Sequence, residues 1–132
     1  MTPSTQIFYG LVFEDDTHPW GDKDPYYWWS ERNIPKPKSQ DEEVLTQWRN
    51  DCLNFSSRSL VECGHLGSGK SPLHTVHIKA SLVYVANVDW KPVDLPELID
   101  RYSPEWDRAI RDFCIRSGVT WDADRAGWKV SA

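Results

Sequence analysis

Alternating and continuous apolar segments predict the strands of a central sheet. Residues 6–13 (QIFYGLVF) are apolar on both faces of an extended chain, which is typical of a central strand with Gly10 at a bulge or a close contact. Residues 73–88 alternate between apolar and polar positions, but this segment exceeds the usual length of one strand. We therefore expect a bend near Ala80 and Ser81. Shorter strands are expected at residues 60–63, 119–121 and 128–130.

Two main helices are predicted from apolar residues spaced three and four positions apart. The first follows a capping-box pattern from Ser39 to Glu42 and extends to about Asn54. Its apolar stripe consists of Val44, Leu45, Trp48, Cys52 and Phe55. The second begins after Ser103 and ends at Gly118. Its stripe consists of Trp106, Ala109, Ile110, Phe113 and Cys114.

Two shorter helical segments complete the predicted order. Asp24 and Pro25 suit an N-cap and the first helical position, so a helix is expected over residues 25–32. Four consecutive aromatic residues on it cannot all face one core, so at least one should be exposed. A helical turn is expected from Asp94 to about Tyr102.

These elements predict one α+β domain over residues 1–132. We expect an antiparallel or mixed sheet of about four to six strands with the two main helices packed on it. A chain of this length buries enough surface to fold without disulfides or a metal.

The charge of the chain is concentrated near its N-terminus. The net charge is −5, with nine acidic and four basic residues in 1–43 and eleven of each in 44–132. Nucleic acid would require a basic surface, so we expect no nucleic-acid partner. The imbalance favours an acidic patch that meets the basic surface of another protein. A solvated loop that only aids solubility is the alternative.

The chain has an odd number of cysteines, Cys52, Cys63 and Cys114, and no C-x-x-C motif. We interpret them as buried thiols in a reducing compartment. No segment approaches the roughly 18 consecutive apolar residues of a membrane span, and no signal peptide is visible. The predicted location is the cytoplasm of the cell that makes the protein.

One stretch matches a motif for nucleotide chemistry. Residues 64–71 (GHLGSGKS) fit the P-loop pattern G-x-x-x-x-G-K-[ST]. Its fixed positions are Gly64, Gly69, Lys70 and Ser71. A P-loop needs a helix directly after the loop, whereas residues 75–78 alternate and are β-branched like a strand. We favour a loop that joins two antiparallel strands, with nucleotide binding by these four residues as the alternative.

No metal or catalytic motif is recognisable. The densest group of candidate ligands is Cys63, His65, His74 and His77. Zinc ligands usually come in pairs two to four residues apart, and His74 and His77 would point to opposite faces of a strand. Asp15, Asp16 and His18 have no partner groups of recognisable spacing for acid–base chemistry. We expect no metal, no cofactor and no catalytic residue, and therefore a non-enzymatic protein.

Aromatic and acidic residues are interleaved between residues 14 and 31. Aromatic anchors surrounded by charge are typical of binding hot spots. The predicted partner-binding residues are Asp15, Asp16, Trp20, Asp22, Asp24, Tyr26, Tyr27, Trp28 and Trp29. The alternative is that Trp28 and Trp29 close one end of the core, because tryptophan is highly buried on average.

Several short motifs at both ends of the chain form a family-like pattern. They are Tyr9-Gly10-x-Val12-Phe13, Pro19-Trp20, Trp28-Trp29, Phe113-Cys114 followed by Gly118, and Gly127-Trp128. With these motifs the chain resembles small accessory proteins of tailed bacteriophages and prophages. The middle of the chain, including the Gly-rich loop, lies outside the resemblance.

The resemblance implies an accessory protein from a phage or mobile element that binds and inhibits a host protein or defence complex. The implied partner is a host protein with a basic surface, met in the host cytoplasm. Three alternatives are an immunity protein that neutralises a bacterial toxin, a P-loop-like nucleotide-binding protein and a minor virion component. Whether the protein forms a homodimer is left open.

Overall fold

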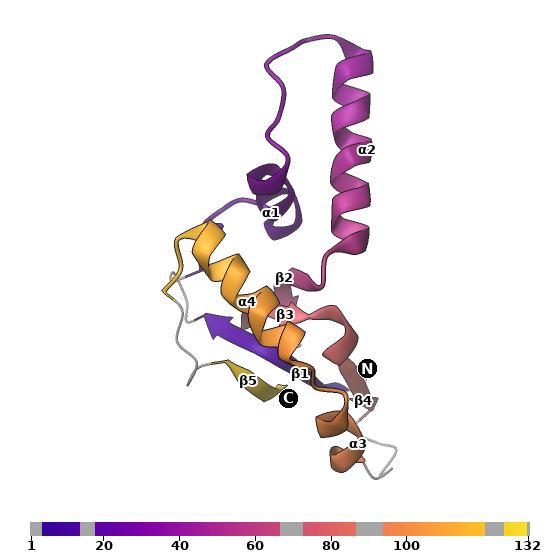
Figure 1. Cartoon of the computed structure of the whole chain (residues 1–132), viewed down its shortest axis with the longest axis vertical. Coiled ribbons are helices and arrows are strands. Elements are labelled where there is room, and N and C mark those ends of the chain that lie inside the picture. The colour runs from indigo at the N-terminus through magenta and orange to yellow at the C-terminus, as the bar shows by residue number, and fades with distance from the viewer. Residues whose placement is uncertain (1–3, 14–17, 67–72, 87–93, 121–125, 132) are drawn as a thin grey trace.

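The computed structural model describes residues 4–13, 18–66, 73–86, 94–120 and 126–131. In these residues the helices are α1 (Pro25–Asn33), α2 (Glu42–Arg58), α3 (Leu95–Asp100) and α4 (Pro104–Ser117). The strands are β1 (Ser4–Phe13), β2 (Val61–Leu66), β3 (Leu73–Ile78), β4 (Val83–Ala86) and β5 (Gly127–Ser131), and a 3-10 helix, η1, covers Lys79–Ser81. The predicted α+β class is confirmed (Figure 1).

Strand β1 is the centre of an antiparallel sheet. One edge of β1 pairs with β3 and then with β4, and the other edge pairs with β5. Strand β2 extends the sheet beyond β3. Residues 119 and 120 are not in a strand, contrary to the prediction, and Trp121 lies outside the described residues.

The predicted bend near Ala80 and Ser81 is confirmed as η1. Strands β3 and β4 run along the same edge of β1, and their registers differ by the three residues of η1. This interruption deprives the Tyr9 amide of a strand partner, and the buried Ser81 hydroxyl accepts its hydrogen bond at 2.8 Å. Ser81 Oγ in turn donates to the Ile78 carbonyl at 2.6 Å. One serine side chain thus replaces the missing ladder bond.

Gly10 is required by a close approach of two strands. A Cβ atom at this position would lie 2.1 Å from the carbonyl oxygen of Val76 on β3. Only glycine lacks that atom, which confirms the predicted close contact and explains the glycine in a buried strand.

The hydrophobic core lies between one face of the sheet and helices α1 and α4. The sheet contributes Tyr9, Leu11, Phe13, Val61, Cys63, Val76 and Ile78 to the core. The helices contribute Trp28, Trp29, Trp106, Ile110, Phe113 and Cys114. Helix α4 has the predicted boundaries, with Ser103 as N-cap and Gly118 at a φ of 73° after its last turn.

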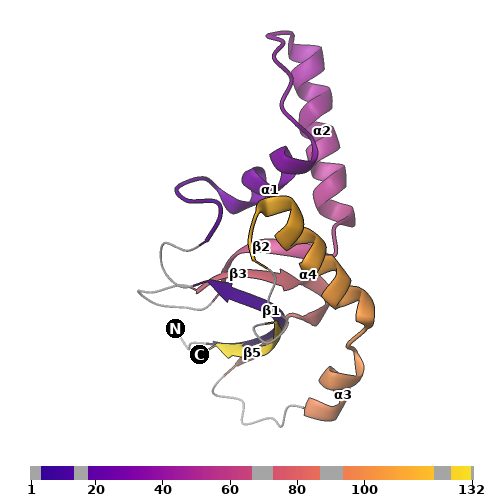
Figure 2. The ribbon, with the colours of Figure 1, turned by 60° about the vertical axis from the view of Figure 1, so that its left-hand side comes forward.

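Helix α2 does not pack on the sheet as predicted. It stands away from the sheet and packs mainly against α1, as Figure 1 and Figure 2 show. Asp41, rather than Ser39, is its N-cap, and the helix continues to Arg58. Cys52 is its one buried residue, because α1 and α4 already cover the sheet face that α2 was expected to fill.

Candidate protein-binding surface

Three of the predicted aromatic anchors belong to the core. The exposed fraction is 3% for Trp20 and 7% for both Trp28 and Trp29. The rings of Trp29 and Phe113 have centroids 4.5 Å apart, so α1 is fastened to α4 by its tryptophans. Trp28 and Trp29 close one end of the core, and their prediction as surface anchors is wrong.

The other predicted binding residues divide into exposed positions and positions outside the described part. Tyr27 is 57% exposed, and Asp22 and Asp24 are exposed beside α1. Asp15 and Asp16 lie outside the described residues, and so does the side chain of Tyr26. One aromatic residue of the predicted set therefore remains on a described surface. This outcome matches the expectation that four consecutive aromatics on a helix cannot all be buried.

The P-loop interpretation lacks its structural requirement. Gly64 pairs with Thr75 and Leu66 pairs with Leu73 in an antiparallel ladder of β2 and β3. The chain after the motif forms a strand, so no helix N-terminus begins there to bind phosphate. Gly69, Lys70 and Ser71 lie outside the described residues. The connection between two antiparallel strands is the one that the alternating pattern favoured.

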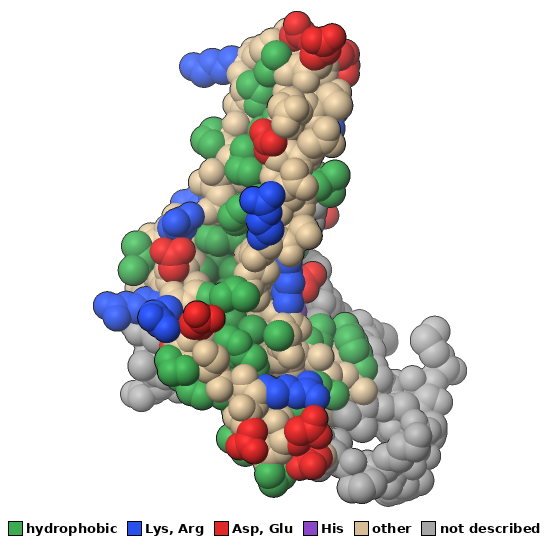
Figure 3. Space-filling view, turned by 45° about the vertical axis from the view of Figure 1, so that its right-hand side comes forward, with side chains coloured by type: hydrophobic (Ala, Val, Ile, Leu, Met, Phe, Trp, Pro, Cys, Tyr) green, Lys and Arg blue, Asp and Glu red, His purple; other side chains and the backbone are tan. Residues whose placement is uncertain are grey.

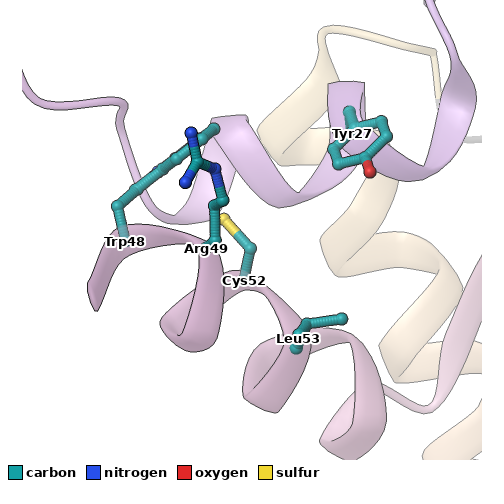
Figure 4. Close-up of a pocket in the computed structure, with 5 residues that line it drawn as sticks. All are labelled: Tyr27, Trp48, Arg49, Cys52 and Leu53. Carbon is teal, nitrogen blue, oxygen red and sulfur yellow. The ribbon is translucent and has the colours of Figure 1, made fainter. Parts of the chain in front are cut away.

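A groove lies between α1 and α2, and it includes Tyr27 from the predicted aromatic set. It measures about 230 Å³ and is lined by Tyr27, Trp48, Arg49, Cys52 and Leu53. Tyr27 comes from α1 and the others from α2, and the side chains of Trp48, Arg49 and Cys52 point toward α1 (Figure 4). Aromatic and aliphatic groups with one cation line this groove.

Trp48 holds the connector between α1 and α2 against the second helix. Its Nε1 atom donates a hydrogen bond of 2.9 Å to the carbonyl oxygen of Ile34. The ammonium of Lys36 lies 5.6 Å from the centre of a Trp48 ring, within range of a cation–π contact. These contacts fasten the connector and α2 to α1. We call residues 25–58 the arm; α1 is its base, with Trp28 and Trp29 in the core, and α2 is the part that projects.

The arm has exposed apolar side chains, and acidic side chains are gathered at the end that lies farthest from the sheet. Leu53 is 58% exposed and Val44 is 41% exposed. Asp41, Glu42 and Glu43 are exposed where α2 begins, and Figure 3 shows acidic side chains gathered at this end. A carboxylate in this position is also favoured by the helix dipole. The arm thus combines a groove, exposed apolar groups and an acidic end.

The thiol in the groove is poorly suited to act as a nucleophile. Burial raises the pKa of Cys52, and the charges of Glu31 and Asp51 raise it further. Burial also raises the pKa of Cys63, and it raises the pKa of Cys114 to about 11. All three thiols are free and buried, as the sequence indicated. Thiolate is the reactive form, so Cys52 contributes apolar surface instead.

Thr75, His77 and Glu62 lie together on the other face of the sheet. They are the residue types of a catalytic triad, but the hydroxyl and the imidazole are not accessible to a substrate. Thr75 Oγ1 lies 2.9 Å from His77 Nδ1, and His77 Nε2 lies 3.6 Å from Glu62 Oε2. The second distance is an electrostatic contact rather than a hydrogen bond. Thr75 and His77 are 0% and 2% exposed, so a substrate cannot reach the hydroxyl. Sequence spacing missed this group because Glu62 meets His77 only through strand pairing.

A carboxylate shared by two tyrosines ties α4 to the sheet. Asp107 accepts a hydrogen bond of 2.6 Å from the Tyr9 hydroxyl and another from the Tyr102 hydroxyl. Burial and the Asp107 carboxylate raise the pKa of Tyr9, and the hydrogen bond to Asp107 raises that of Tyr102. Both phenols therefore stay protonated and act as structural donors.

Comparison with protein-family models, curated proteins and solved structures found no match to this chain. In the part of the chain that the structure describes, no helix has both the length and the apolar character needed to cross a membrane.

Proposed function

We propose that this chain is a non-enzymatic binding protein that uses its arm to engage and inhibit another protein. The observation that carries the proposal is helix α2, which has 17 residues and buries Cys52 alone. A helix in water gains most of its stability from burying an apolar face. A partner in the groove would supply further burial for Tyr27 and Leu53, which line it.

The chemistry of the arm defines one kind of partner. The groove fits an apolar side chain, because its lining is aromatic and aliphatic apart from Arg49. The carboxylates of Asp41, Glu42 and Glu43 fit basic side chains on the same partner. At a rise of 1.5 Å per residue, Trp48 and Leu53 at the two ends of the groove lie about 9 Å and about 17 Å from Glu42 along α2. The partner is therefore a protein that presents an apolar anchor and a basic cluster at this separation.

Inhibition of a host protein or defence complex is the role that the resemblance to phage accessory proteins supports. The acidic N-terminal third is consistent with a basic target surface. A bacterial toxin as target would instead favour the immunity-protein hypothesis, and a second copy of this chain would favour a homodimer. The identity of the captured protein separates these outcomes.

The test compares two equivalent substitutions on different helices. Leu53→Asp places a charge in the groove, and Ile115→Asp places the same charge on α4, where Ile115 is 69% exposed. A partner captured with the wild-type chain is purified and titrated against each variant. We expect Leu53→Asp to weaken binding at least about tenfold, the equivalent of about 1.4 kcal/mol, because a desolvated apolar contact is lost. Ile115→Asp should bind like the wild type.

Circular dichroism and thermal unfolding verify that both variants fold. Reversal of charge at Glu42 and Glu43 should slow association and reduce its dependence on salt. Equal binding by the Leu53→Asp and wild-type chains contradicts the proposal, as does equal loss in the Leu53→Asp and Ile115→Asp variants.

A further inference from the structure

Helix α4 has an exposed side that combines one apolar side chain with basic side chains. Arg108, Arg111 and Ile115 are spaced three and four positions apart, so they lie along the same side of the helix. Ile115 is 69% exposed, and both arginines are exposed. Among the described residues, Arg108 and Arg111 form no ion pair or hydrogen bond. An apolar anchor and two free cations thus face solvent on α4.

A surface of the opposite charge lies on α2. Glu42 and Leu53 are separated by about three helical turns, so the acidic end of the arm lies on the same side of α2 as the groove. Glu42 lies 4.0 Å from Arg49, and both side chains are largely exposed. Asp41 and Glu43 form no ion pair with any described residue. The acidic end therefore lacks a close basic partner within the described part of its own chain.

We propose that helix α4 of a second copy of this chain docks on the arm. Ile115 of one copy enters the groove of the other, and Arg108 and Arg111 lie beside its acidic end. Opposite charges across the contact favour this occupant and set its orientation. The inference rests on the proposed function, because it uses the same groove.

The spacing of the side chains on the two helices is compatible with this contact. At 1.5 Å per residue, Arg108 lies about 10.5 Å from Ile115 along α4. Glu42 lies about 9 Å from Trp48 and about 17 Å from Leu53 along α2, so the two separations agree. In both helices the charged residues precede the apolar ones in sequence. The two helices therefore run in the same direction when they pack together.

The shape of the molecule presents both surfaces. Helix α2 projects away from the sheet, whereas α4 lies over the sheet, as Figure 1 and Figure 2 show. Each copy has one arm and one α4, so the contact joins different surfaces of the two copies. It covers the groove, and a concentrated chain thus occupies its own partner-binding site.

Sedimentation equilibrium of the whole chain measures the contact. Concentrations up to about 1 mM are used, because one apolar anchor and two charges make a weak interface. The average mass should rise above that of one chain, and high salt should reduce the rise. Ile115→Asp and Leu53→Asp should each weaken self-association at least about tenfold. Val130→Asp, at a position on β5 that is also 69% exposed, should self-associate like the wild type.

An exchange of charges identifies the two surfaces. Reversal of charge at Glu42 and Glu43 in one variant, and at Arg108 and Arg111 in another, should weaken the self-association of each. An equal mixture of the two variants should restore association, because a basic arm then meets an acidic α4. A wild-type chain that stays monomeric overturns the proposal, as does a mixture that associates no better than either variant. Equal loss in Ile115→Asp and Val130→Asp also overturns it.

Partner binding is measured separately, with this chain too dilute to self-associate. A wild-type chain that binds its partner through the groove but stays monomeric contradicts the docking of α4 alone. Self-association that Leu53→Asp and Ile115→Asp both weaken, together with unchanged partner binding by Leu53→Asp, contradicts the proposed function alone. Circular dichroism verifies that every variant folds.

Discussion

Helices α2 and α4 carry apolar stripes of the same spacing, but they have different surroundings. Helix α4 buries Trp106, Ile110, Phe113 and Cys114 against the sheet. In the stripe of helix α2, Cys52 alone is buried, Val44 is exposed, and Leu45, Trp48 and Phe55 are half-buried. A helical stripe therefore indicates which face will be apolar, and the rest of the fold decides what covers that face. Helix α4 belongs to the folded body, whereas α2 forms part of a surface available to a partner.

The largest expected difference between the two helices is in the free energy of unfolding that is lost when one apolar side chain is shortened to alanine. Phe113→Ala removes a ring that is 0% exposed and contacts both Trp28 and Trp29. The free energy of unfolding should fall by about 3–5 kcal/mol, the range for a buried phenylalanine. Val44→Ala on α2 should change it by less than about 0.5 kcal/mol, as at other surface positions. Urea unfolding followed by tryptophan fluorescence measures both values.

Equal destabilisation by Phe113→Ala and Val44→Ala would contradict the comparison. It would mean that α2 folds as part of the same cooperative core as α4.

The helix caps should show a smaller difference of the same kind. Ser103 Oγ accepts a hydrogen bond from the Glu105 amide, in the turn that buries Trp106. Ser103→Ala should therefore cost about 1 kcal/mol of global stability. Asp41 accepts from the Glu43 amide at 2.8 Å, in a turn whose residues are exposed. Asp41→Ala should reduce the helical signal in circular dichroism and leave the urea midpoint nearly unchanged.

Asp41→Ala could instead shift the urea midpoint as much as Ser103→Ala does. That result would show that α2 unfolds together with α4 and the sheet. Amide hydrogen exchange then provides an independent measurement, because amides of an α2 that unfolds separately should exchange faster than those of α4.

The smallest expected effect is on how the melting temperature depends on pH, and it compares Glu62 on β2 with Glu42 on α2. The neighbouring His77 lowers the pKa of Glu62, and this outweighs the rise caused by burial. A lowered folded-state pKa means that the carboxylate stabilises the fold at neutral pH, and that this stabilisation is lost as the pH falls through that pKa. Glu62→Gln should lower the melting temperature at pH 7 more than at pH 3.

Glu42→Gln in the arm provides the matched control. Glu42 lies 4.0 Å from Arg49, with side chains 83% and 57% exposed, so this ion pair should contribute little. Its melting temperature should follow the wild-type pH profile. A constant difference between Glu62→Gln and wild type at every pH would contradict the assigned role of His77.

Local sequence features determined most of the secondary structure. Ser103, Pro104 and Gly118 mark the ends of α4 through backbone hydrogen bonding and a positive φ, which depend on neighbouring residues alone. The alternation after residue 73 indicated strands, and this decided against a P-loop. The requirement for glycine at position 10 also followed from its place within a buried strand.

Tertiary structure decided which surfaces remain for function. Whether Trp28 and Trp29 face a core or a partner depends on α4, whose Phe113 contacts both rings from a distant part of the chain. Whether the stripe of α2 is covered depends on the rest of the fold, because α1 and α4 already cover the core face of the sheet. The contact between His18 and His74, and that between Glu62 and His77, arise from chain packing and strand register. Sequence periodicity reports the preference of one element for burial, whereas a site requires side chains from several elements to meet in space.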